Sequence, residues 1–278
     1  MATQVDYSAE AVAAARAVLL ELAHLLGVFH DDLVVVGGWV PELLLPRQAH
    51  IGSTDVDLAV NHRTLEEPHY AHFKELLLSR GYRQAESQPF IFYRTVPTAQ
   101  GRQIQVEVDL LAGEYEGTSA RHRTQKFDDV LARKARGADL AFESFTEIEL
   151  QGELPGGGKD QARIRVASMV PFLVMKGIAL ADRLKEKDAW DIYFCVRHYP
   201  GGIAALAQAF EPHLRHSLVR EGLDKIAQKF ASPDHVGPRF VADFEAATDP
   251  EERVRLQRDA FERVDRLLAL LKGVSGQQ

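Results

Sequence analysis

The fold of this chain is decided by two stretches, VVVGGWVP at residues 34–41 and GSTDVDLAV at residues 52–60. In the first, an apolar run ends in the pair Gly37-Gly38, which predicts a buried strand and a tight turn into a helix. In the second, a strand-like run carries Asp55 and Asp57 one residue apart. Because side chains alternate along a strand, both carboxylates project from one face, about 7 Å apart.

Two carboxylates on one strand face repel each other unless a cation neutralises them. Oxygen ligands beside a glycine turn suit Mg²⁺ bound together with a phosphate-bearing substrate. Gly37 and Gly38 would let the backbone approach a phosphate closely. Ser53 and Thr54 would either donate to a phosphate oxygen or cap the turn. The alternative is a glycine turn beside a solvated acidic strand with no site.

A third carboxylate is expected from the stretch QIQVEVDLL at residues 103–111. Its alternation places apolar side chains on one face and polar side chains on the other, which predicts a strand. A fully polar face is normally exposed to solvent. Next to the strand that carries the aspartate pair, this face would instead supply Glu107 or Asp109 as a further ligand of a two-metal site.

The 278 residues divide by character at about residue 168. Strand-like and helical segments are mixed before that point, and helix follows helix after it. We therefore expect an α+β protein, with some α/β character, in which a mixed β-sheet flanked by helices (residues 1–167) precedes a helical C-terminal domain (residues 168–278) that contributes to the cleft. The expected strands are 33–36, 55–60, 90–94, 103–111, 147–151 and 163–167. The expected helices are 9–26, 38–45, 66–80, 171–180, a helix capped by Asp188, 222–230, 238–247 and 249–272.

Composition is ordinary for a soluble globular protein, with 46% hydrophobic and 26% charged residues. The N-terminal residues lack the pattern of a signal peptide, and no apolar run approaches the roughly 18 residues of a membrane span. The single Cys195 excludes an intramolecular disulfide. We expect a cytoplasmic protein without membrane contact.

With a net charge of −7, the overall electrostatic field of the protein does not favour binding to nucleic acid. The basic segment Arg121–Arg136 is a local exception and permits an RNA acceptor. The alternative for this segment is a solvated helix face balanced by Asp128 and Asp129.

In their order, these motifs resemble the nucleotidyltransferase superfamily, whose fold is shared with DNA polymerase β. The signature of that superfamily is an apolar residue and a glycine pair followed, after a spacer, by Asp-h-Asp-h, where h is apolar. Val36-Gly37-Gly38 and Asp55-Val56-Asp57-Leu58 match it here. The sequence Val108-Asp109-Leu110-Leu111 is similar to the region of its late third aspartate, which favours Asp109 over Glu107 as the third ligand.

The later part of the chain resembles the branch of AbiEii-type abortive-infection toxins and their MenT relatives. In that branch an isolated helical lysine is followed by a Lys-Asp-x-x-Asp segment, and Lys176 and Lys187–Asp191 match these features. By this resemblance Lys176 contacts the nucleotide triphosphate, and Asp191 completes or supports the active site. The family often has an arginine shortly before the aspartate pair, where Gly52 stands here, so Arg47 or His50 would have to bind phosphate instead.

The resemblance implies a transferase that moves an NMP from an NTP, such as ATP, to an acceptor hydroxyl. Two Mg²⁺ ions would be held by Asp55, Asp57 and Asp109. Toxin relatives suggest an RNA acceptor, such as a tRNA 3′ end, and an antitoxin protein as a further partner. The residues leave open a small acceptor of the aminoglycoside type, a protein hydroxyl, or a non-catalytic nucleotide-binding regulator of the same fold.

Overall fold

The structure is a computed structural model of the chain, and it describes residues 3–61, 73–98, 100–113, 124–127 and 130–275. The chain packs as two compact units. The sheet unit comprises Tyr7–Leu44 and Ile51–Ser168. The helical unit comprises Met1–Asp6, Leu45–His50 and Met169–Gln278, so that the short segment before the aspartate pair groups with the helices.

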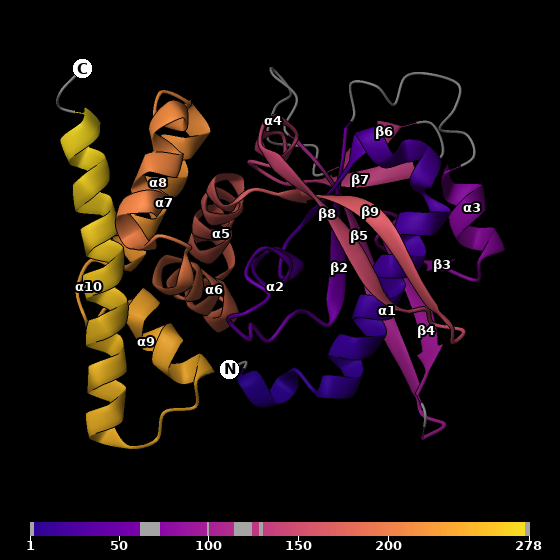
Figure 1. Ribbon diagram of the computed structural model, residues 1–278, viewed down its shortest axis with the longest axis horizontal. Helices are drawn as coiled ribbons and strands as arrows, with labels where there is room; N and C mark the ends of the chain where they lie inside the picture. Colours follow the sequence, from indigo (N-terminus) through magenta and orange to yellow (C-terminus); the bar gives the residue numbers. More distant parts are fainter. Residues whose placement is uncertain (1–2, 62–72, 99, 114–123, 128–129, 276–278) are drawn as a thin grey trace. The chain divides into compact units, whose positions relative to one another are not determined.

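The sheet unit contains a mixed β-sheet, which confirms the α+β class (Figure 1). Its strands are β1 (Leu33–Val36), β2 (Asp55–Val60), β3 (Arg83–Gln84), β4 (Ile91–Pro97), β5 (Gln103–Ala112), β6 (Thr124–Phe127), β7 (Val130–Lys134), β8 (Phe145–Glu153) and β9 (Lys159–Ala167). They follow the order β3-β4-β5-β2-β1-β9-β8, and β7 pairs with both β5 and β6. The β2–β5, β1–β9 and β5–β7 pairs are parallel, whereas β1–β2, β3–β4, β4–β5, β6–β7 and β8–β9 are antiparallel.

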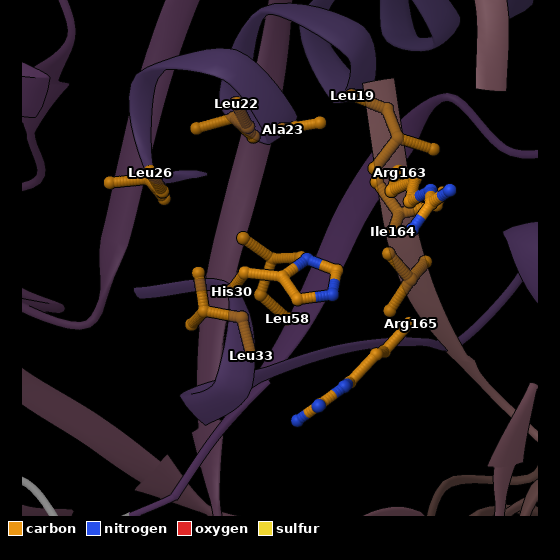
Figure 2. A pocket seen from close by; sticks show the side chains of 11 residues that line it. Leu19, Leu22, Ala23, Leu26, His30, Leu33, Leu58, Arg163, Ile164 and Arg165 are labelled. Carbon is orange, nitrogen blue, oxygen red and sulfur yellow. The ribbon is translucent and has the colours of Figure 1, made fainter. Parts of the chain in front are cut away.

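One face of this sheet is covered by α1 (Ala9–Leu25). The helix begins where predicted, because the Ser8 hydroxyl accepts a hydrogen bond from the backbone N–H of Ala11 at 3.3 Å. Leucines of α1 line a small apolar cavity together with Val35 and Leu58 of the sheet (Figure 2). Since Leu58 belongs to this covered face, alternation along β2 sends Asp55 and Asp57 to the opposite face.

Shorter helices complete the sheet unit: η2 (Gly27–Asp32), α2 (Trp39–Leu44), α3 (Phe73–Ser79) and α4 (Leu140–Glu143). The helix expected at 66–80 is seen as α3, while residues 66–72 lie outside the described part of the chain. Gly81 follows α3 with φ of +88°, as expected of a residue that ends a helix.

The helical unit contains η1 (Gln4–Asp6), α5 (Met169–Arg183), α6 (Glu186–His198), α7 (Gly202–Phe210), η4 (Glu211–His213), α8 (Ser217–Lys229), α9 (Val236–Phe244) and α10 (Pro250–Ser275). Helix α7 was not predicted from the sequence. The crossing of α5 and α8 is close: a Cβ at Gly177 would lie 2.6 Å from the carbonyl oxygen of Gly222. None of the described helices is long and apolar enough to cross a membrane.

Candidate functional site

The parallel pairing of β2 with β5 brings the predicted carboxylates together. Asp57 lies opposite Asp109, and Asp55 lies opposite Glu107. Residues paired in register point to the same face of a sheet, so all four carboxylates share the face away from α1. We call Asp55, Asp57, Glu107 and Asp109 the acidic group. Asp109 is buried, and the other three are half-buried.

The glycine turn contacts this group directly. In the β1–β2 pair Val36 lies opposite Asp57, and Gly37 follows it with φ of +69°. A Cβ atom at Gly37 would lie 1.9 Å from Asp57 Oδ2. Gly37 is therefore required twice, by its left-handed backbone and by the carboxylate that occupies the space of a side chain. The buried Gly38 completes the turn into α2.

The start of β2 is fixed by hydrogen bonds around Asp55. The indole Nε1 of the buried Trp39 donates to the Asp55 carbonyl oxygen at 2.7 Å. The Ser53 hydroxyl donates to Asp55 Oδ1, so Ser53 serves a carboxylate in this structure. Thr54, the other predicted phosphate ligand, is half-buried beside it.

Asp109 is held from the side of β5 opposite to β2. Leu111 pairs with Ala59 on one edge of β5 and with Arg133 of β7 on the other. From there Arg133 Nη2 donates to Asp109 Oδ2 at 2.5 Å. No local sequence pattern marks Arg133 as a site residue, because this contact depends on how β7 pairs with β5.

The Asp109–Arg133 pair is incomplete. Asp109 Oδ1 and Arg133 Nε are both buried, and neither has a hydrogen-bond partner among the described residues. Burial raises the pKa of Asp109 to about 6, and the neighbouring Arg133 guanidinium offsets only part of this effect. A carboxylate in this setting gains from any cation that reaches its second oxygen.

The acidic group fits a hard divalent cation by donor type. All of its ligands are carboxylate oxygens, which Mg²⁺ prefers, and Asp109 contributes a buried oxygen that lacks a partner. In the described part of the chain, however, no three His, Cys, Asp or Glu side chains are gathered closely enough to hold a metal ion. In this structure Asp109 is engaged by Arg133 and Asp55 by Ser53, so these carboxylates would have to reorient to share a cation.

The remaining predicted site residues belong to the helical unit and cluster with one another there. Lys176 Nζ lies 2.8 Å from Asp188 Oδ1 and 2.7 Å from Asp191 Oδ2. Asp191 also pairs with Lys187 at 2.8 Å and with His50 Nε2 at 3.0 Å. We call this set the ion cluster: His50, Lys176, Arg183, Lys187, Asp188 and Asp191. Arg183 binds Asp188 from its edge, and the other members are buried.

Two expectations about these residues change. Asp188 does not cap α6, which begins at Glu186; its carboxylate binds Lys176 and Arg183 instead, because burial requires a partner for each charge. His50 is engaged by Asp191. Arg47, the other residue considered for phosphate binding, is exposed in the helical unit.

The pKa values within the ion cluster are set by burial and by the opposite charges that each buried group contacts. Burial lowers the pKa of Lys176, but the Asp188 and Asp191 carboxylates more than offset this and hold it above its ordinary value. Burial raises the pKa of Asp191, but Lys176 and Lys187 hold it far below its usual range. Burial lowers the pKa of His50 to about 4, against the hydrogen bond with Asp191, so His50 is neutral at pH 7.

The basic segment Arg121–Arg136 is described only in part, since residues 121–123 and 128–129 lie outside the described residues. Its described part forms β6 and β7, so the alternative of a solvated helix face is wrong there. Arg133 is turned toward Asp109, although its side chain remains 41% exposed. Contact between this segment and RNA stays a prediction.

Comparisons with known proteins add little to this geometry. No family model matches the sequence, and no curated protein matches it. A crystal structure of an antigenic nucleotidyltransferase-like protein from Paracoccidioides brasiliensis is similar over 77% of this chain and 87% of that chain, with a TM-score of 0.47 and 18% sequence identity. Neither the family nor the activity of this chain follows from a likeness at that level.

Proposed function

We propose that this chain is a metal-dependent nucleotidyltransferase of the superfamily that its motifs resemble, with its catalytic centre at the acidic group. The observation that supports this most is the β2–β5 register, which sets Asp57 against Asp109 on one face of the sheet. The contact between Gly37 and Asp57 adds a turn without side chains at the same place. Carboxylates beside such a turn suit a triphosphate bound with divalent cations.

In the proposed reaction, an acceptor hydroxyl oxygen bonds to the α-phosphorus of an NTP. The bond from that phosphorus to the oxygen bridging to the β-phosphate breaks, and pyrophosphate leaves with the bond's electron pair. Asp109 accepts the hydroxyl proton and passes it to water. The Gly37-Gly38 turn gives phosphate oxygens room beside Asp57, and Ser53 holds Asp55 in place.

Asp55, Asp57 and Asp109 would hold Mg²⁺, in two ions by the family pattern, with Glu107 as the alternative third carboxylate. When bound, the metal would neutralise the triphosphate and offset the charge on the attacking and leaving oxygens. This chemistry does not require Lys176 or Asp191, whose charges are met within the ion cluster. The variants Asp191→Asn and Lys176→Met test their predicted roles at the nucleotide.

The acceptor is proposed from motif resemblance alone. The similarity of Lys176 and Lys187–Asp191 to AbiEii-type toxins favours an RNA 3′ end, such as that of tRNA, with an antitoxin protein as partner. The net charge of −7 favours a small cationic acceptor instead. The RNA acceptor and the small cationic acceptor are therefore tested side by side in one experiment.

To test the proposal, the full chain is incubated with each α-labelled NTP, Mg²⁺, and either total RNA, aminoglycosides or cell extract. We expect label to appear in one acceptor fraction. The rate should fall on the order of a thousandfold or more in Asp55→Asn/Asp57→Asn, because the variant loses the charges that hold the metal. Asp160→Asn, at an exposed carboxylate of β9, is the matched control and should transfer normally. Equal labelling by the wild type and the double variant would rule out the proposed chemistry.

A second candidate is a regulator of the same fold that binds a nucleotide without turning it over. It is favoured by the Asp109–Arg133 contact and by the lack of three gathered metal-binding side chains in the described residues. Metal-dependent NTP binding that depends on Asp57, with no label transferred to any acceptor, would support this candidate over the enzyme.

A further inference from the structure

The pairing of Asp109 with Arg133 leaves one acceptor and one donor unused. A single bond joins Arg133 Nη2 to Asp109 Oδ2. Arginine and a carboxylate usually pair through two parallel bonds when the geometry allows it. Here the second carboxylate oxygen and the guanidinium Nε–H are both buried and lack partners among the described residues. Buried polar atoms nearly always have a hydrogen-bond partner, so we expect a further partner for each of these two atoms.

The two unused atoms call for opposite kinds of partner. Asp109 Oδ1 needs a cation or a hydrogen-bond donor, and Arg133 Nε–H needs an anionic or neutral acceptor. A triphosphate that carries a divalent cation presents both at once. The strand pairing supports these roles, because Asp109 pairs with Asp57 of β2, whereas the Arg133 side chain reaches Asp109 from β7, where Arg133 pairs with Leu111 on the other edge of β5.

We propose that Arg133 is the nucleotide-positioning residue of this site. Without substrate it holds Asp109, and with substrate it donates to a phosphate oxygen while Asp109 turns to the divalent cation. The inference rests on the proposed function and names the residue that takes the place of the arginine missing at Gly52. Arg133 belongs to the same unit as the acidic group and contacts it, whereas His50 is engaged by Asp191.

A well-paired arginine of the same unit offers a matched control. Arg165 donates to the Asp31 carbonyl at 2.7 Å and to its carboxylate at 2.5 Å, and it also binds Glu147. It is one of the residues that line the cavity beside the leucines of α1 (Figure 2), and its partners Asp31 and Glu147 do not belong to the acidic group. Its loss should therefore affect folding but not the acidic group.

The test measures two affinities in the full chain, with Arg133→Gln, Arg133→Lys and Arg165→Gln compared with the wild type. Titration calorimetry or the electron paramagnetic resonance of Mn²⁺ gives the affinity for the metal alone. Calorimetry with the non-reacting analogue α,β-methylene-ATP, at saturating Mn²⁺, gives the affinity for the nucleotide. Thermal unfolding checks that each variant is folded.

We expect the two affinities of Arg133→Gln to move in opposite directions. Mn²⁺ should bind about three- to tenfold more tightly, because no guanidinium competes for Asp109. The nucleotide should bind about tenfold or more weakly, because a charge-assisted hydrogen bond is lost. Arg133→Lys should recover part of the nucleotide affinity, since it keeps the charge but not the planar donor fork. Arg165→Gln should change neither affinity.

A purely structural role would weaken both affinities together, and that result overturns the inference, as does a change below twofold in both. A failure of the proposed metal site can be distinguished from a failure of the role proposed for Arg133. If Asp57→Asn leaves Mn²⁺ binding unchanged, the metal site of the proposed function is wrong. If Asp57→Asn abolishes Mn²⁺ binding while Arg133→Gln shifts neither affinity, the proposed function stands and only the role of Arg133 is wrong.

Discussion

The acidic group of the sheet unit and the ion cluster of the helical unit both gather charged side chains, but they differ in how those charges are met. In the ion cluster three cations face two carboxylates, and Asp191 alone receives Lys176, Lys187 and His50. In the acidic group four carboxylates from β2 and β5 share one face of the sheet, and the contact with Arg133 leaves a buried atom without a partner on each of Asp109 and Arg133. One set is complete within the described residues, and the other is not.

This difference supports the proposal that the ion cluster stabilises the fold and that the acidic group binds a ligand. Burying a charge is costly unless it is paired and hydrogen-bonded, so a complete cluster is what stability demands. An incomplete buried pair lowers stability, and such pairs are found where a ligand supplies the missing contacts. Under the proposed function, Lys176 and Asp191 are structural residues and Asp57 and Asp109 are functional ones, and the following predictions test this division.

The largest effect is expected from Asp191→Asn, which leaves Lys176 and Lys187 buried with too little negative charge. We expect the free energy of unfolding to fall by about 3–5 kcal/mol, the usual loss when one partner of a buried ion pair is removed. Urea unfolding of the full chain measures it. Asp57→Asn makes the same chemical change at the half-buried acidic group and should lower stability by less than about 1 kcal/mol.

The opposite outcome would assign Asp191 to the active site. If Asp191→Asn folds with native stability but loses nucleotide transfer or binding, its carboxylate acts on substrate as the toxin resemblance implies. The same reasoning applies to Lys176→Met, where the hydrophobic side chain keeps the volume and removes the charge.

The sequence predicted those parts of the site that depend on local order. Strand β2 was predicted with its observed bounds, and its period of two placed Asp55 and Asp57 on one face. The observed register then set Asp109 opposite Asp57 and Glu107 opposite Asp55, a distinction that no local pattern contains. Register depends on how strands distant in the chain pair, so it could not be derived from either stretch alone.

Long-range partners account for what was missed. Arg133 follows Asp109 by 24 residues and meets it only because β7 pairs with β5. His50 meets Asp191 across 141 residues of sequence, and this contact diverts it from the phosphate role considered for it. Helix α7 begins after a left-handed Gly201 with no side-chain cap, so the usual signal for a helix start is missing there.

Acid should weaken the ion cluster through His50 before it affects the carboxylates. The pKa of His50 is about 6.5 in an unfolded chain and about 4 in the folded one, because the side chain is buried beside Lys187 and Lys176. The unfolded chain thus takes up a proton that the folded chain refuses, and stability falls as the pH drops from 6.5 toward 4. Between pH 7 and pH 5 the protonation of His50 in the unfolded chain should lower the free energy of unfolding by about 2 kcal/mol.

The comparison that isolates this effect is His50→Gln, which keeps a hydrogen-bond donor for Asp191 but cannot take up a proton. Urea unfolding of both proteins at pH 7, 6 and 5 should show that the free energy of unfolding falls more steeply with decreasing pH in the wild type than in the variant. Parallel losses in the two proteins would mean that His50 is not the group responsible, and that burial does not keep its side chain neutral.

The smallest effect concerns Asp109→Asn and has the opposite sign. Asp109 is buried with one oxygen unpaired, and its pKa is raised to about 6, so at pH 7.5 its ionised form opposes folding. Replacing it by a neutral side chain of the same shape should raise the free energy of unfolding by about 1 kcal/mol in EDTA, after the lost contact with Arg133 is counted. Adding Mn²⁺ should stabilise the wild type more than the variant, because only the wild type supplies a charged carboxylate at this position. A loss of stability in Asp109→Asn without metal would place Asp109 with Asp191, as a residue kept for the fold.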